Sequence, residues 1–287
     1  MKNCLLGFLF FFLILAPINA EEPNSSPAAN VQEDVPQEIL KTDLIWQKAR
    51  LDEEIVKLKA SYQAQLENYL YQEKLYRIAY DQHKQLQTLV SIEDLTQKAK
   101  NLGLIRDEVL ISYLDLLRLN LIATEGIELS LKNQHLNQLE TNLVFLKEHH
   151  EQLQTLNERE AVAGALTNFS LQNKNLASQC QEVLVFLTIG NLQMIYDKAF
   201  VLKQDIDLFL TDKGNMDLPA ISRASDETNR SLNAAKLKLD DFWSNTLRRS
   251  QSNGYLANFY DDLPRVLNPI YVNLSQSIAY LNELLSI

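Results

Sequence analysis

The fold is decided by residues 51–90, which read LDEEIVKLKASYQAQLENYLYQEKLYRIAYDQHKQLQTLV. Side chains suited to a helix interface recur there at alternating steps of four and three residues: Leu51, Ile55, Leu58, Tyr62, Gln65, Tyr69, Gln72, Tyr76, Ala79, His83, Leu86 and Val90. This spacing keeps one face of an α-helix against a partner helix, as in coiled coils. The stretch therefore predicts one long helix over about 43–90.

Two further segments repeat the pattern. One covers about 107–158, with Gly126 as its weak point, and follows a short helix over 91–103 that begins with a Ser cap and ends at a Gly. The other covers about 161–211. No proline occurs from 37 to 218, as long helices require, because proline costs about 3 kcal/mol in a helix interior. The similar lengths of the three segments predict antiparallel packing.

The C-terminal quarter predicts two more helices, one after Asp217 and one over the last 20 or so residues, where apolar residues again follow four-three steps. The composition agrees, since 52 residues are Leu and only 7 of 287 are Gly, against a usual Gly content of about 7%. The predicted fold is all-α: an elongated antiparallel bundle of long coiled-coil-like helices, with three long helices plus two C-terminal helices. The predicted parts are a signal peptide (1–20), a disordered tether (21–37), the long bundle (38–215) and a C-terminal helical pair packing on it (216–287).

The N-terminus has the pattern of a secretory signal. Lys2 precedes an apolar run from Leu5 to Leu15, and small residues end at Ala20. The sequence predicts cleavage after Ala20 and export to the periplasm, cell envelope or extracellular space. The alternative is an N-terminal membrane anchor, although Pro17 ends the run short of the roughly 20 residues that a span needs.

The net charge argues against two classes of partner, and the cysteine count argues against a disulfide. The formal net charge is −10, which disfavours nucleic acid and strong binding to anionic membrane surfaces. Cys180 is the only cysteine beyond the predicted signal, so no intramolecular disulfide is expected. Its seam position between Leu176 and Val183 predicts a buried, inert thiol.

Sequence patterns for catalysis and for metal binding are missing. The sequence has no Gly-x-Ser-x-Gly, no Gly-rich phosphate loop and no His-Glu-x-x-His. The pair His149 and His150 cannot chelate one ion from a single helix, because adjacent residues point about 100° apart. The interpretation is a solvated His149 and a seam-packed His150. We predict no enzyme, with no catalytic, cofactor-binding or metal-binding residues and no cofactor.

The segment lengths also predict a register. Antiparallel pairing sets position 150 against position 47 on the preceding long helix and against Phe169 on the following one. The His150 ring is then half-buried near Arg50, an environment that favours its neutral form.

One stripe of side chains stands out, because Tyr62, Tyr69, Tyr76 and His83 recur every seven residues on one helix face. They either form an interaction stripe or fill a partly wet helix interface. Four Asn-x-Ser sequons, which matter only in a eukaryotic host, lie at Asn24, Asn168, Asn229 and Asn273.

The sequence therefore favours an exported, non-catalytic helical-bundle protein that acts as an interaction, spacer or scaffold module, with an unknown protein partner. Homo-oligomerisation stays open. The alternative is a ligand carrier or sensor domain that holds a small apolar molecule in its core, supported only by seam gaps at Asn173 and Gly190.

Overall fold

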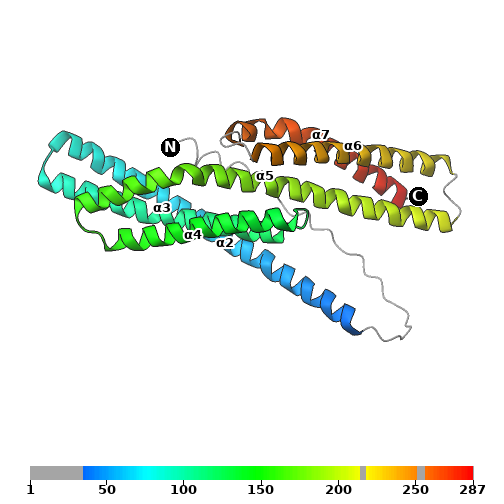
Figure 1. Ribbon diagram of the computed structural model, residues 1–287, viewed down its shortest axis with the longest axis horizontal. Helices are drawn as coiled ribbons and strands as arrows, with labels where there is room; N and C mark the ends of the chain where they lie inside the picture. The colour runs from blue at the N-terminus through cyan, green and yellow to red at the C-terminus, as the bar shows by residue number, and fades with distance from the viewer. Residues whose placement is uncertain (1–34, 214–217, 251–255, 287) are drawn as a thin grey trace. The chain divides into compact units, whose positions relative to one another are not determined.

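The computed structural model describes residues 35–213, 218–250 and 256–286, and these ranges contain six helices and no strand (Figure 1). The predicted all-α class is confirmed. The predicted signal peptide and nearly all of the predicted tether lie outside the described residues. The helices are α2 (Val35–Leu86), α3 (Leu89–Ala123), α4 (Leu129–Thr155), α5 (Arg159–Asp212), α6 (Pro219–Ser250) and α7 (Leu256–Leu285).

The chain divides into two compact units, Met1–Arg50 and Leu51–Ile287. The described part of the first unit is the beginning of α2, where Trp46 is 69% exposed. The second unit contains the rest of α2 and the five helices that follow it, and it carries the buried core.

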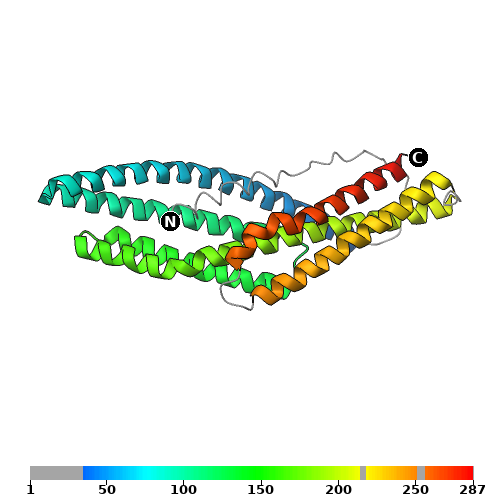
Figure 2. The same ribbon diagram turned by 90° about the horizontal axis from the view of Figure 1, so that it is seen from above.

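Within the second unit, α5 belongs to two helical bundles. Its first half packs with α3 and α4, and its second half packs with α6 and α7 (Figure 2). The core of the first bundle includes Leu114, Leu117 and Leu146, and that of the second includes Leu239 and Ile270, all fully buried. α5 reaches both bundles because its 54 residues span about 80 Å at 1.5 Å per residue.

The short helix predicted over 91–103 is wrong, because α3 runs unbroken through Gly103. Gly103 instead lies inside α3 where that helix packs closely on Leu153 and Leu166. A Cβ added there would lie 2.7 Å from Leu153 Cδ2 and 2.8 Å from Leu166 Cδ2. The absent side chain lets α3 approach the α4–α5 turn closely.

The second long segment, predicted over 107–158, is also not continuous. It breaks at the predicted weak point, since α3 ends at Ala123 and α4 begins at Leu129. A Cβ on Gly126 would overlap the carbonyl oxygen of Gly190 in α5. Sequence periodicity misses this break because the four-three pattern resumes on the other side of it.

The predicted register between α4 and α5, which set position 150 against Phe169, is correct to within one residue. The ring centroids of His149 and Phe169 are 5.2 Å apart, and His149 Nε2 lies 3.2 Å from the carbonyl oxygen of Ala165. The partner of His149 on the preceding helix is Asp107 of α3, with Nδ1 and Oδ2 2.6 Å apart. The predicted pairing with position 47 assumed a long helix that starts near 107, and α3 starts 18 residues earlier.

Candidate interaction site at the α2–α3 turn

The stripe predicted on α2 lies half-buried along that helix. The Tyr62 ring contacts Tyr113 of α3, with centroids 5.6 Å apart, and His83 Nδ1 lies 3.0 Å from Ser91 Oγ. Burial raises the pKa of both Tyr62 and Tyr69 above its ordinary value. The stripe therefore contributes to packing between α2 and α3, and its role as an interaction surface stays a prediction.

The stripe leads to the turn that joins α2 to α3. Gln87 adopts a left-handed backbone (φ 49°), and its N–H donates to the His83 carbonyl at 2.9 Å, a common way to end a helix. Thr88 then caps α3. Its side chain accepts from the Ser91 N–H at 3.3 Å, while Ser91 Oγ accepts from the Thr88 N–H at 3.1 Å. This capping box begins three residues before the predicted one.

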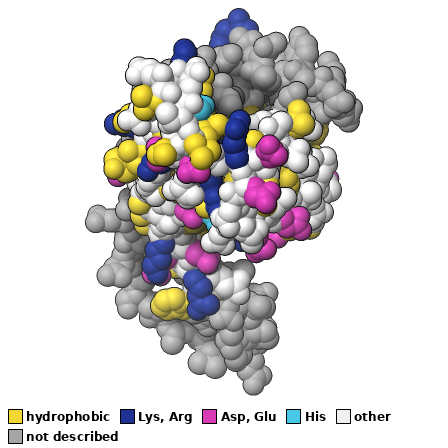
Figure 3. All heavy atoms as spheres, turned by 90° about the vertical axis from the view of Figure 1, so that its left-hand side faces the viewer, with side chains coloured by type: hydrophobic (Ala, Val, Ile, Leu, Met, Phe, Trp, Pro, Cys, Tyr) yellow, Lys and Arg dark blue, Asp and Glu magenta, His cyan; other side chains and the backbone are white. Residues whose placement is uncertain are grey.

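Three large aliphatic side chains surround this capped turn and face the solvent. Leu86 is 63% exposed, Leu89 73% and Val90 75%. Residues 85–92 include no charged side chain. Figure 3 looks onto the end of the molecule where this turn lies and shows hydrophobic side chains at the surface among charged ones. We call Leu86, Leu89 and Val90 the aliphatic tip.

The aliphatic tip corrects the predicted seam, which placed both Leu86 and Val90 against a partner helix. The seam ends because α2 ends at Leu86, so the chain has turned before Val90. A signal for the turn was present in Thr88 and Ser91, which are three residues apart and both able to cap a helix. The prediction followed the periodicity and not this capping signal, because Leu86 and Val90 continue the four-residue step.

A rigid apolar tip is suited to docking. Burying one aliphatic side chain fully is worth about 1.5–3 kcal/mol relative to leaving it exposed. The four hydrogen bonds that join Ser91 to Thr88 and His83 hold the turn in one conformation, so little conformational entropy is lost on binding.

A second polar cluster lies in the interior of the first bundle, and it reverses the prediction for the histidine pair. His149 is 5% exposed and Asp107 fully buried, whereas His150 is only half-buried. Both 149 and 150 fit the four-three spacing, and the buried carboxylate decides between them. Arg106 completes the cluster, since its Nη2 donates to Asp107 Oδ1 at 2.9 Å.

The chemistry of this cluster is that of a structural link. Both ring nitrogens of His149 face oxygen acceptors, the carboxylate of Asp107 and the carbonyl of Ala165. With both ring nitrogens facing groups of the bundle itself, neither is left for another molecule. Burial lowers the pKa of Arg106, whose guanidinium lies 3.2 Å above the Phe169 ring. The cluster thus joins α3, α4 and α5.

Cys180 lies where the sequence predicts, in the core of α5. It is 3% exposed beside Leu176, Val183 and Leu184. Burial raises the pKa of its thiol to about 12. A thiol in this environment stays protonated and unreactive at neutral pH.

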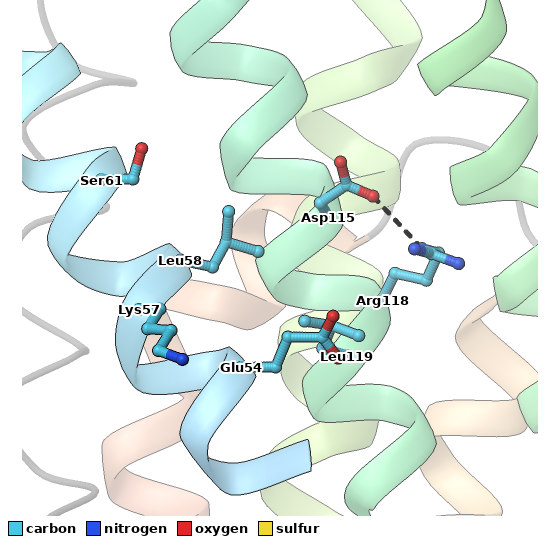
Figure 4. Close-up of a pocket in the computed structure, with 7 residues that line it drawn as sticks. All are labelled: Glu54, Lys57, Leu58, Ser61, Asp115, Arg118 and Leu119. Atoms are coloured by element: carbon cyan, nitrogen blue, oxygen red, sulfur yellow. Dashed lines mark hydrogen bonds and ion pairs between the residues drawn. The ribbon is translucent and has the colours of Figure 1, made fainter. Parts of the chain in front are cut away.

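A groove of about 410 Å³ opens between α2 and α3 (Figure 4). Leu58 and Leu119 lie among four charged side chains: Glu54, Lys57, Asp115 and Arg118. Arg118 Nε donates to Asp115 at 3.2 Å. Charges of both signs fit a polar or zwitterionic ligand better than an apolar one. The gap at Gly190, which supported the alternative of a ligand carrier, is filled by Thr124 and Ile127 and leaves no room for a ligand.

In the part of the chain that the structure describes, no three His, Cys, Asp or Glu side chains group as metal ligands would. None of the described helices is long and apolar enough to cross a membrane. Comparison with protein-family models, curated proteins and solved structures finds no match.

Proposed function

We propose that this chain is an exported, non-catalytic helical-bundle protein that acts as an interaction, spacer or scaffold module in the cell envelope or outside the cell. The α2–α3 turn is the part that it presents to a protein partner. The observation that carries this proposal is the aliphatic tip, in which three side chains that are 63–75% exposed are held on a hydrogen-bonded turn.

Length and packing support the same proposal. The far end of the 35-residue helix α3 packs on Gly190 of α5, so the α2–α3 turn lies away from the second half of α5 and from α6 and α7 (Figure 1). Exposed apolar side chains at such a position carry a cost in solubility, and in soluble proteins they commonly mark binding surfaces.

Crosslinking in the native compartment tests the partner. A photo-crosslinking side chain replaces Leu89 in one variant and Leu171, a 60% exposed residue of α5, in a control. We expect a protein adduct from position 89 that is weaker or absent from position 171. Equal adduct patterns from both positions would contradict docking at the tip.

Export is tested separately. N-terminal sequencing of the chain recovered from the envelope or medium should begin at Glu21, because small residues precede it. Recovery of the chain from a membrane fraction with Met1 intact would instead support the anchor.

A further inference from the structure

A second exposed apolar surface follows the line where α5 and α7 pack together. On α5 it contains Ile195, Leu202 and Phe209, which are 37%, 40% and 60% exposed. On α7 it contains Tyr271, Ile278 and Leu285, which are 41%, 42% and 60% exposed. In each helix the three residues are seven positions apart. We call these six residues the α5–α7 ribbon.

The position of the α5 residues follows from the contacts of that helix. Lys203 Nζ donates to Ser225 Oγ of α6 at 2.9 Å, and Tyr196 lies 5.6 Å below the ammonium of Lys236 of α6. At 3.6 residues per turn, Leu202 lies on the other side of the buried line from Lys203 and Tyr196. That side is the one that borders α7, which packs on α5.

The same argument holds for α7. Glu283 pairs with Arg223 of α6, and Ile278 lies on the opposite side of the buried line through Leu274 and Leu281. The two sets of apolar residues therefore flank one shared groove.

The two sets are also level with each other. Ser225, which contacts Lys203, is two residues from Arg223, which contacts Glu283. Leu202 and Ile278 therefore lie at the same height within about one helical turn. The spacing of seven then matches Ile195 with Tyr271 and Phe209 with Leu285, so the ribbon has three rungs.

The charges around the ribbon indicate what covers it. From Val266 to the end of the chain the only charged residue is Glu283, and it points to α6. On the outer edge of α5, three residues beyond each ribbon residue, lie Lys198, Asp205 and Asp212. Lys198 and Asp205 are both exposed and lie almost symmetrically about Leu202.

We propose that a second copy of this chain docks on the α5–α7 ribbon, antiparallel and related by a two-fold axis at Leu202 and Ile278. Ile195 of one copy then covers Phe209 of the other, and Lys198 of each copy faces Asp205 of the other. A face-to-face pairing of α5 with α7 in parallel would leave these charges beside the uncharged edge of α7, so the charges favour the antiparallel form.

The size of the ribbon predicts the strength of the dimer. From position 195 to 209 the ribbon is about 21 Å long. With a width of two helices, the interface buries about 800 Å² in total, at the weak end of specific interfaces. We expect a weak dimer that dissociates reversibly on dilution.

The test is sedimentation of the purified full chain from micromolar to several hundred micromolar concentration. We expect reversible dimers. Leu202→Glu should be monomeric throughout, whereas the control Leu237→Glu, at a 71% exposed site on α6, should dimerise as the unchanged chain does. A monomer at every concentration, or a Leu202→Glu variant that still dimerises, would overturn the proposal. Circular dichroism shows whether each variant keeps its helices.

Two further variants test the orientation. Lys198→Glu should weaken the dimer on the order of tenfold by opposing like charges, and adding Asp205→Lys should restore it. In a Cys4→Ser background, Leu202→Cys should crosslink to itself through a short bismaleimide, while Leu237→Cys should not. No crosslink at 202 would rule out the antiparallel form. None of these outcomes bears on the aliphatic tip, which is tested through its own crosslinks.

Discussion

The two turns that flank α3 place their aliphatic side chains in opposite ways. At the α3–α4 turn, Ile127 is 6% exposed and Thr124 is 4% exposed, and both pack on Gly190 of α5. At the α2–α3 turn, Leu89 and Val90 are 73% and 75% exposed. The same chain can therefore bury aliphatic residues at a turn when a neighbouring helix offers a site for them.

The two turns are held in place by different interactions. The α3–α4 turn is fixed by its packing on Gly190. It is also held by a hydrogen bond, because Lys132 Nζ donates to the Thr124 carbonyl at 2.5 Å. The α2–α3 turn is fixed by its own hydrogen bonds and leaves its apolar residues uncovered. A turn that is ordered without burying its aliphatic side chains has them available for another molecule.

We expect the greatest loss of stability from a substitution in the α3–α4 turn. Gly126→Ala should lower the free energy of unfolding by about 3 kcal/mol, at the upper end for overpacking, because its Cβ would overlap the backbone oxygen of Gly190. Urea denaturation measures this change.

Gly103→Ala is the matched control. Its Cβ would press only on the flexible ends of Leu153 and Leu166, and alanine favours a helix over glycine by about 1 kcal/mol. We expect a change within about 1 kcal/mol. Equal losses in the two variants would mean that the contact between Gly126 and Gly190 is not tight.

The two glycines show which features of the fold can be predicted from the sequence and which cannot. Periodicity predicts long helices because their apolar residues repeat in every turn, and it correctly places Cys180 in the core and Phe169 beside the histidine pair. Periodicity does not reveal where two helices pack closely at a glycine. For this reason the predicted short helix ended at Gly103, and Gly126 was predicted only as a weak point within a continuous helix.

The candidate site was missed in the sequence for a related reason. Leu86 and Val90 fit the seam in the sequence, and only the turn at Gln87 removes them from it. The choice between His149 and His150 likewise depends on Asp107, which is 42 positions away. Spacing describes one helix at a time, whereas burial depends on the neighbours.

The second prediction concerns acid and the anchoring of the α3–α4 turn. His135, early in α4, is 1% exposed and stacks on Phe186 of α5 with centroids 4.4 Å apart. Burial lowers its pKa, although Glu182 and the hydrogen bond with Gln138 act in the other direction. The unfolded chain therefore binds the proton more readily than the folded chain does.

Stability should accordingly fall as the pH falls through about 6.5, the ordinary histidine pKa, and this contribution should level off below the pKa of the folded form. Urea midpoints measured between pH 8 and pH 5 test this expectation. His135→Phe should flatten the slope. A slope that survives His135→Phe would assign the acid sensitivity to another group.

The third prediction concerns a substitution that weakens the α2–α3 turn. Ser91→Ala removes three contacts of the Ser91 hydroxyl: the bond it accepts from the Thr88 N–H, the bond it donates to the Thr88 carbonyl and the contact with His83. The bond from the residue 91 N–H to Thr88 Oγ1 remains. We expect a loss of about 1 kcal/mol, typical of a capping residue, and faster hydrogen exchange at 88–92. Thr96→Ala, which removes a hydroxyl bonded only to the Ile92 carbonyl of its own helix, should cost less. A larger loss for Thr96→Ala would contradict the capping role of Ser91.

The smallest expected effect on stability is at the aliphatic tip itself. Leu89→Ser should change the free energy of unfolding by less than about 0.5 kcal/mol, because an exposed side chain has little native packing to lose. Ile127→Ser, the corresponding change at the buried turn, should cost several times more, since it leaves a cavity and buries a hydroxyl. If Leu89→Ser destabilised the chain as much as Ile127→Ser, its side chain would be packed within the fold and unavailable to a partner. A stable Leu89→Ser chain that loses its crosslinked partner in the envelope would separate binding from folding at this turn.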